Sequence, residues 1–331
     1  MSVPGESTWR MPIPEGKADY LIAVAARAPS VQNSQPWRFR ILPNLLELHA
    51  DPARELRVDP AGREMLISCG AALFGLRLGV RSLGFLPVVE LLPEESRPTL
   101  LARVGLGEPR PMDPSERTLL HALPHRHTHR GPFTPEPLPA GSLAELRHAA
   151  AAEGATLTLI GRGRGYERLA DIIAGAGPTL DLDPSAQADM RDWTRGPGSE
   201  ARDGVPASAF PATAGHCRGR LPQRDFDLGR GASYPEPDGP APAATAVLLT
   251  PGDDRGDWLC AGQALHCVLA YAATQWVFAS LHTRPLEDAR TRGLIRERLA
   301  LPGAVQMIMQ LGRAHTTRVT ARRPPSELID S

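Results

Sequence analysis

The sequence predicts an α+β fold made of two tandem halves that pack against each other through a pair of small-residue helices. Helix-length amphipathic segments and short strand-like runs are intermixed over the 331 residues, which is typical of an α+β chain. The two helices, at about 64–85 and 258–281, both carry a Gly-x-Ala-Leu motif, at residues 70–73 and 262–265. Each precedes a Pro-containing turn and a later strand that ends in GLG or QLG. We therefore expect a divergent internal duplication, with chance similarity between two Ala-rich helices as the alternative.

The first half, residues 1–110, predicts a helix, a hairpin, one of the two long helices and two further strands. The first helix stops before Pro29, because a residue that precedes proline avoids the helical conformation. The hairpin is predicted where WRFRIL and LLELHA flank a Pro-Asn turn. In chain order we expect a helix at 17–27, hairpin strands at 37–42 and 45–50, a helix at 64–85, and strands at about 88–92 and 100–106.

The second half, residues 111–331, begins after a Pro-rich linker and contains a long irregular segment. Residues 176–244 are rich in Pro, Gly, Asp and Arg and show weak periodicity. Loops this long are uncommon unless they form a functional lid or are disordered. Around this segment we expect helices near 114–123 and 139–152, a strand at 156–160, a helix at about 164–175, a strand at 245–250, the long helix at 258–281, a helix at about 287–300, and a strand at 304–312.

Composition indicates a soluble globular protein. Lys plus Arg and Asp plus Glu are equal at 37 each, which gives no overall electrostatic reason to expect a nucleic acid. The longest apolar run, 258–281, carries Gln263, His266 and Gln275 and fits a buried helix better than a membrane span. Four cysteines without a CxxC pair and an N-terminus without a secretory pattern predict a reducing, cytoplasmic location.

Three islands rich in Arg, amide and hydroxyl side chains interrupt this scaffold. In the second island, HRHTHRGPF, an extended backbone places two guanidinium groups and a hydroxyl on one face, which is what a phosphate monoester needs. A solvated basic loop is the alternative for each island taken alone. The candidate binding residues are Arg27, Ser30, Gln32, Asn33 and Gln35 in the first island, Arg126, Thr128 and Arg130 in the second, and Arg322 and Arg323 in the third.

Other kinds of site have weaker support. His125, His127 and His129 alternate as in some metal sites, but no acidic or Cys ligand lies nearby and the interleaved arginines would repel a cation. The sequence has no G-x-S-x-G motif, and GRGRGYE at 161–167 does not fit the dinucleotide-binding G-x-G-x-x-G pattern. We therefore expect neither a metal nor a nucleophilic side chain nor a Rossmann site.

ARAPSVQNSQPWRF at 26–39 resembles the flavin-binding signature A-P-S-x-x-N-x-Q-P-W of the nitroreductase superfamily. RHTHR at 126–130 resembles the phosphate-binding segment R-R-S-x-R of that superfamily, and RPLE at 284–287 and ARRP at 321–324 resemble its late P-I-E-G turn and C-terminal Arg. The chain is most similar to the Acg-like branch of FMN-binding proteins, in which two nitroreductase-like halves are fused. The resemblance runs from about residue 17 to 330 and is weakest in the long middle segment.

This resemblance implies a nitroreductase-like fold in which the tandem halves form a pseudo-dimer within one chain, with mixed sheets flanked by helices. It also implies one FMN per chain, since each half carries only part of the motif set. Arg126, Arg130 and Arg323, with Arg322, would hold the phosphate. Ser30, Asn33 and Thr128 would bind the ribityl chain or ring edge, and the peptide near Leu286 and Glu287 would donate toward flavin N5. Arg27, Gln32 and Gln35 complete the expected cofactor-binding set.

Two positions depart from the family pattern. Asp288 stands where the turn usually has Gly, and His127 stands at the second Arg of R-R-S-x-R. The implied function is an FMN-dependent oxidoreductase that transfers hydride from NAD(P)H to a nitro, quinone or other electron-poor acceptor, without a catalytic side chain. The alternatives are a flavin-sequestering protein with little turnover and a biosynthetic oxidoreductase that uses the same flavin. Residues 176–244 would form a lid, and the chain would act as a monomeric pseudo-dimer or pair further as a homodimer.

Overall fold

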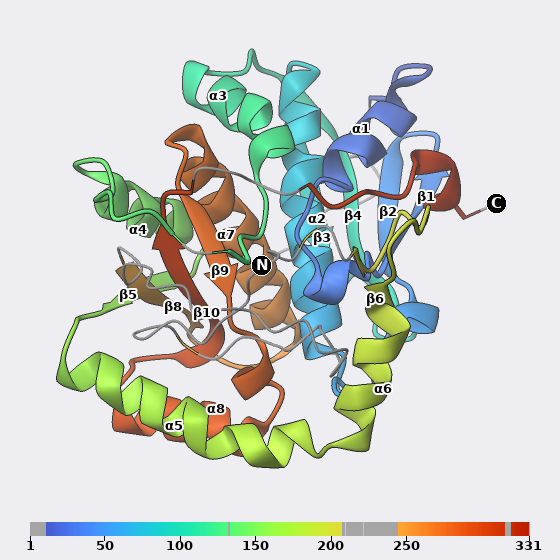
Figure 1. Ribbon diagram of the computed structural model, residues 1–331. Coiled ribbons are helices and arrows are strands. Elements are labelled where there is room, and N and C mark those ends of the chain that lie inside the picture. The colour runs from blue at the N-terminus through green and yellow to red at the C-terminus, as the bar shows by residue number, and fades with distance from the viewer. Residues whose placement is uncertain are drawn as a thin grey trace.

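The computed structural model of the chain describes residues 11–131, 133–206, 209, 221, 244–314 and 319–330. These residues form an α+β fold with two four-stranded sheets on either side of a central pair of helices, α2 and α7 (Figure 1). The first half contributes α1 (Lys17–Ala25), β1 (Trp37–Leu42), β2 (Leu45–Ala50), α2 (Arg63–Ser82), β3 (Phe85–Leu91) and β4 (Leu100–Pro109). The second half contributes α3 (Pro114–Ala122), α4 (Ser142–Ala152), β5 (Thr156–Ile160), α5 (Arg164–Asp181), α6 (Pro184–Trp193), β6 (Thr194–Arg195), β7 (Val205–Pro206), β8 (Ala244–Thr250), α7 (Arg255–Thr274), β9 (Phe278–Leu281), α8 (Ala289–Arg298) and β10 (Ala304–Gly312).

The two large sheets have the same topology. Their strand orders are β1-β2-β4-β3 and β5-β8-β10-β9, so the third and fourth strands exchange places in both. In both halves the long helix, α2 or α7, lies between the second and third strands of the chain order. This repeated connection confirms the predicted fold of two tandem, related halves.

Parallel pairing is limited to the edges of these sheets. All neighbouring strands in both four-stranded sheets pair antiparallel. Phe39 of β1 forms a parallel bridge with Ile329, and Ala279 of β9 forms one with Thr128. The C-terminal segment of the second half therefore extends the sheet of the first half, as its path beside β1 shows (Figure 1). Among the described residues, the mixed character expected of these two sheets comes from such bridges.

The central helices approach so closely that only glycine fits at two points of their interface. A Cβ added to Gly262 of α7 would lie 2.0 Å from Ile67 O, and one added to Gly70 of α2 would lie 2.3 Å from Leu259 O. Both contacts are with backbone oxygens, which cannot move aside as a flexible side chain can. The expectation that the two Gly-x-Ala-Leu helices pack against each other is confirmed.

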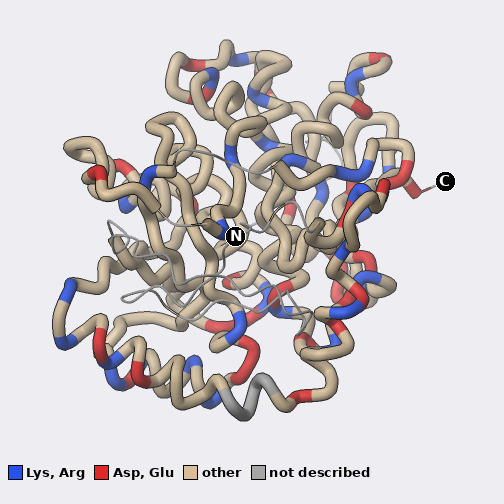
Figure 2. Tube along the Cα trace, viewed as in Figure 1, with Lys and Arg blue, Asp and Glu red and all other residues tan. Residues whose placement is uncertain are grey.

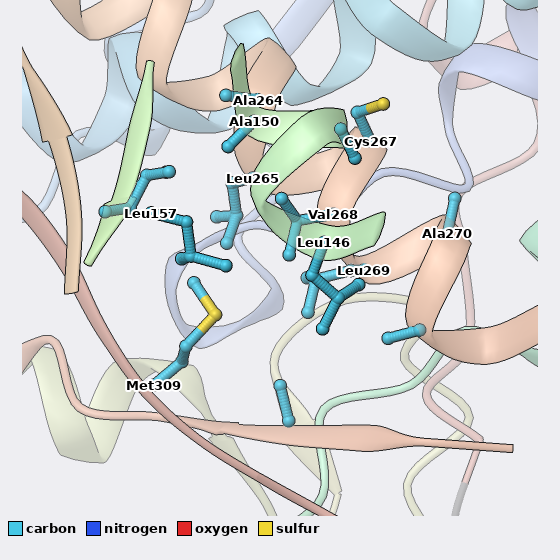
Figure 3. Close-up of a cluster of buried hydrophobic side chains, with 14 of the residues drawn as sticks. Leu146, Ala150, Leu157, Ala264, Leu265, Cys267, Val268, Leu269, Ala270 and Met309 are labelled. Atoms are coloured by element: carbon cyan, nitrogen blue, oxygen red, sulfur yellow. The ribbon is translucent and has the colours of Figure 1, made fainter. Parts of the chain in front are cut away.

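Three apolar clusters form the core. One joins α1 and α2 to the inner face of β1, β2 and β4. A second fills the space between α4, α7 and the second sheet, with Leu146, Leu157, Val268 and Met309 among its members (Figure 3). A third lies on the other face of that sheet, under α5 and α8. Because both faces of the second sheet are covered, β8 is apolar along most of its length instead of alternating.

The prediction of a long helix at 258–281 is wrong at the C-terminal end of the helix. Helix α7 ends at Thr274, and residues 278–281 form β9, which pairs with β10. The chain turns at Trp276, whose φ of 55° is in the left-handed region, and Val277 N–H donates to Ala272 O at 2.9 Å. A glycine normally marks such a helix end. Here the pairing of β9 overrides an apolar sequence that would otherwise continue the helix.

The segment 176–244 is partly regular. Helix α5 continues to Asp181 and α6 follows at 184–193, so the expectation of an irregular chain is wrong for these residues. Asp183 caps α6 by accepting from Ser185 N–H at 2.9 Å. Residues 194–206 then return toward the first half through the short β6–β7 pair. Most of the predicted lid, from 207 to 243, lies outside the described residues apart from 209 and 221.

Charge and hydropathy agree with a helix-centred core. Among the described helices, α2 has the length and hydropathy to span a membrane, but 89% of that window is buried inside the fold, as in a core helix. Acidic and basic residues are interspersed along the trace (Figure 2). The apolar character of α2 is therefore explained by its position between the two sheets.

Gly262→Ala is expected to destabilise the protein, because its Cβ would overlap Ile67 O and force the two halves apart. Overpacking of this kind costs about 1–3 kcal/mol or more, and urea unfolding would measure it. Gly175→Ala is the matched control, since a Cβ at that helical position meets nothing within 4 Å. The control is expected to be neutral or stabilising by up to about 1 kcal/mol. Equal stability of Gly262→Ala and wild type would contradict the close helix contact.

Candidate functional site

A cavity lies where the two halves meet, and both halves supply its walls. Its empty volume is about 890 Å³ with the open solvent at its mouth included. The first half supplies residues 29–32 and one face of α2, and the second supplies residues 128–130 and 280–285. The predicted site residues that line this cavity are Ser30, Gln32, Thr128 and Arg130.

The wall from the first half is a turn in which three residues other than glycine have positive φ. The φ angle is 49° at Gln32, 55° at Asn33 and 50° at Gln35. Each such residue costs on the order of 1 kcal/mol and persists only where its surroundings hold it. Ser30 starts the turn, and its Oγ accepts a hydrogen bond from Gln35 N–H at 3.0 Å. The polar side chains of this stretch therefore first serve to hold an unusual backbone.

Asn33 and Gln35 do not line the cavity; their side chains join the turn to other segments of the chain. Asn33 Nδ2 donates to Gly204 O at 2.9 Å. Gln35 Nε2 donates to Arg202 O at 2.7 Å, and its Oε1 accepts from Arg323 N–H at 2.9 Å. Their amides are thus used by contacts with two distant segments, 202–204 and 320–323. The structure gives these two residues a role in shaping the wall, where the sequence predicted contact with a cofactor.

Arg54 fastens the same turn to the segment that precedes β7. Its Nη1 donates to Ser34 O at 2.6 Å and to Asp203 Oδ2 at 3.0 Å. Asp203 also accepts from Arg195 Nη2 at 2.8 Å. Burial raises the pKa of Asp203, but the hydrogen bonds from both arginines outweigh burial and lower it overall. The carboxylate therefore stays ionised. It joins residues 194–206 of the second half to the turn that forms the wall from the first half.

A cluster of arginines adjoins this turn and Arg130 of the cavity wall. Burial, then the charge of Arg130, lowers the pKa of Arg126 to about 10. Burial, then the charges of Arg126, Arg27 and Arg130, lowers the pKa of Arg322 to about 9. Arg126 is 4% exposed, and its Nε and Nη1, like Nε of Arg322, have no hydrogen-bond partner among the described residues. The guanidinium groups of this cluster therefore lie close enough to disfavour each other's charge.

The C-terminal arginine of this cluster is Arg322, not Arg323. Arg322 Nη1 donates to Asn33 Oδ1 at 2.9 Å, and Nη2 donates to Ala28 O at 3.2 Å. Arg323 turns the other way: its Nη2 donates to Glu327 O at 2.5 Å and its Nε lies 3.4 Å from Glu327 Oε2. The sequence motif gave Arg323 the main role, but consecutive residues point to different sides of an extended segment.

Two histidines beside this cluster have lowered pKa values. Burial, then Arg126, lowers the pKa of His127 to about 4. Burial and then Arg126 also lower the pKa of His266 on α7 to about 3, and His266 Nδ1 lies 2.6 Å from Ala71 O. His127 therefore replaces a family Arg without adding charge. Among the described residues, no group of three or more His, Cys, Asp and Glu side chains could hold a metal ion.

The late turn predicted to face a ligand borders the cavity through residues 283–285. Leu286 is 1% exposed and belongs to the core under α5 and α8. The Glu287 N–H donates to Arg284 O at 3.2 Å within the turn, so it is already used. Asp288, which departs from the family Gly, caps α8 by accepting from Thr291 N–H at 2.9 Å. The Asp that replaces the family Gly at position 288 therefore has a structural role as the N-cap of α8.

Helix α2 supplies cavity residues that the sequence analysis missed. Glu64, Ile67 and Ser68 line the cavity from one face of the helix. Ser68 Oγ donates to Glu64 O at 2.7 Å and accepts from Val31 N–H at 3.3 Å, which joins the helix to the turn. Their spacing of three and four residues was a signal that they share a face. It could not be interpreted without knowing which face of a fully buried helix meets a ligand.

The described geometry places a cavity with walls from both halves beside a cluster of arginines. Comparison with known proteins extends this conclusion. No model of a known protein family matches the chain. The chain is 33% identical over 318 residues to the Mycobacterium tuberculosis H37Rv protein named "Putative NAD(P)H nitroreductase Rv3131", over 94% of this chain and 90% of that protein. It is 27% identical over 316 residues to "Putative NAD(P)H nitroreductase acg" of the same strain, over 93% of both chains.

A solved structure shows a more distant likeness. The FMN-dependent nitroreductase NfnB from Mycobacterium smegmatis, in complex with NADPH, aligns with a TM-score of 0.41 and 13% identity, over 64% of this chain and 96% of that one. A likeness of this degree carries no argument by itself. The fold consists of two halves with a cavity between them, and the relation to Rv3131 covers nearly all of both chains. The chain therefore belongs to the nitroreductase family, a family of oxidoreductases.

Arg126→Met is expected to stabilise the ligand-free protein, because it removes a buried cation that repels Arg130 and Arg322. Replacing buried charged groups by apolar ones can add on the order of 1–4 kcal/mol to the free energy of unfolding, which urea denaturation measures. The matched control is Arg323→Met, which removes the contacts with Glu327 and is expected to lower stability. A ligand-free Arg126→Met protein that is less stable than wild type would contradict the assignment of Arg126 to ligand binding.

Proposed function

We propose that this protein is an FMN-dependent oxidoreductase that takes hydride from NAD(P)H and passes it to a small electron-poor acceptor such as a nitro compound or a quinone. The observation that carries the proposal is the cavity between the two halves, with a buried arginine cluster beside it. The relatives named as NAD(P)H nitroreductases over nearly the whole chain support the same reaction class. The site is proposed to be complete within one chain.

The residues present fit the FMN phosphate. Arg126 offers two guanidinium nitrogens and Arg322 offers one that have no hydrogen-bond partner among the described residues. Charge-assisted hydrogen bonds to a phosphate would satisfy these donors and neutralise the repulsion within the cluster. In this assignment Arg126, Arg130 and Arg322 hold the phosphate, and Arg27 lies at the edge of the cluster. Arg323 acts through Gln35, to whose Oε1 its N–H donates at 2.9 Å.

The flavin ring is assigned to the cavity. Ser30 and Gln32 from the first half and Thr128 from the second would border the ring and ribityl chain, because they line opposite walls. Thr128 is fixed by its bridge to Ala279, and the following His129 N–H donates to Ala279 O at 2.8 Å. When bound, FMN would supply the hydride acceptor and donor, and the chain would supply placement and electrostatics.

Retention of FMN through its phosphate has a direct test in equilibrium binding. Each charge-assisted hydrogen bond is worth roughly 1.5–3 kcal/mol. Arg130→Ala and Arg322→Ala are therefore expected to raise the FMN dissociation constant at least about tenfold, as measured by fluorescence quenching. Riboflavin is expected to bind wild type much more weakly than FMN, and Arg130→Ala is expected to leave riboflavin binding unchanged. Equal affinity for riboflavin and FMN would refute the phosphate assignment.

Reduction by a nicotinamide separates an enzyme from a flavin-storage protein. Anaerobic addition of NADPH or NADH to the FMN-loaded protein is expected to bleach the long-wavelength flavin absorbance, and an electron-poor acceptor is expected to restore it. FMN that stays oxidised with both nicotinamides but is reduced by dithionite would instead indicate sequestration. That result would contradict the proposed reductase activity but not the proposed FMN site.

A further inference from the structure

Hydride transfer to a nitro group or a quinone also consumes a proton, so the cavity must admit a proton donor. Among the described residues that line it, the titratable side chains other than arginine are Glu64, His129 and His282. His129 packs its ring against Phe133, with ring centroids 4.8 Å apart. Glu64 differs from both histidines because a second buried carboxyl, that of Asp59, accompanies it.

Glu64 lies in the first turn of α2 and is 5% exposed. It lines the cavity together with Ile67 and Ser68, three and four residues along the helix, so its side chain is on the helix face that meets the cavity. Asp59 is 7% exposed and accepts a hydrogen bond from Met65 N–H at 2.9 Å. This cap explains Asp59 structurally, but it does not explain an acid on the cavity wall.

We propose, on the basis of the proposed function, that Glu64 is the proton donor of the acceptor-reducing step and that Asp59 keeps it supplied. In that step the acceptor gains hydride, with its electron pair, from the reduced flavin and a proton from the Glu64 carboxyl group. A quinone thereby becomes a quinol, and a nitro group becomes a nitroso group plus water. The flavin returns to its oxidised form, Glu64 is left as carboxylate, and a solvent proton restores the acid through the carboxyl pair.

The charges around the pair allow it to hold a proton at neutral pH. Burial, then the charge of Glu64, raises the pKa of Asp59 to about 7, against the lowering effects of Met65 N–H and Arg63. A proton held by this pair reaches the acceptor through Glu64, because Glu64 lines the cavity and Asp59 does not. From the second half, the cationic side chains that line the same cavity are Arg130 and Arg284, beside His129 and His282. These cations favour the ionised form once the proton has been given up.

The test compares the FMN-loaded wild type with Glu64→Gln, which keeps the shape and loses the acid. Reduction by NAD(P)H needs no proton donor and is expected to change little. Reoxidation by a quinone is expected to slow about 100-fold, the usual contribution of a general acid. In wild type this step is expected to slow as pH rises through about 7, since the acid must be protonated. Glu55→Gln, at an exposed position, is the matched control and is expected to behave as wild type.

A readout independent of turnover is the proton uptake when the bound flavin is photoreduced in weak buffer. Negative charge added to the cavity raises the pKa of the pair, so wild type is expected to take up more protons near pH 7 than Glu64→Gln. Asp59→Asn removes the neighbouring charge and is expected to shift the pH limb of reoxidation downward. Unchanged reoxidation and proton uptake in Glu64→Gln, or an unshifted limb in Asp59→Asn, would overturn this role. If only the role of Glu64 is wrong, wild type still binds FMN. If wild type does not bind FMN, the proposed function itself is wrong.

Discussion

The fold depends on the contact between α2 and α7, where the backbones of the two halves meet at Gly70 and Gly262. Each glycine faces a backbone oxygen of the other helix at a distance that excludes any side chain. This contact fixes the separation of the two sheets. It thereby sets the width of the cavity, which has walls from both halves. A change of even one methyl group here would alter the site at a distance, since packed helices transmit displacement rather than absorb it.

The second constraint is electrostatic. Arg126 is buried and Arg322 is half-buried, and neighbouring arginines repel the charge of each. Both keep guanidinium nitrogens that have no hydrogen-bond partner among the described residues. Such an arrangement lowers the stability of the ligand-free chain and is retained where a ligand restores the balance. The strained turn at 32–35 follows the same principle. Arg54 donates to Ser34 O, and the Asn33 side chain donates to Gly204 O and accepts from Arg322, so the segments that surround the site also determine its shape.

The sequence predicted the fold class and most of the helices and strands, and four of its candidate binding residues, Ser30, Gln32, Thr128 and Arg130, line the cavity. Motif order and hydrophobic period carry that information because they are local. Side-chain partners could not be predicted where tertiary contacts decide. Asn33 and Gln35 match a binding motif but spend their amides on the segments 202–204 and 320–323. Arg322 and Arg323 differ by one residue and point to different partners, which depends on the path of an extended segment. Glu64 could not be recognised, because every side chain around it on α2 is also buried.

The central claim is that two halves of one chain complete one flavin site. Native mass spectrometry of the protein loaded with FMN tests it most directly, because it reports the ligand count of each oligomeric state separately. One site per chain predicts a single FMN on each monomer and two on each homodimer. One FMN per dimer, or two FMN molecules on one chain, would contradict this claim.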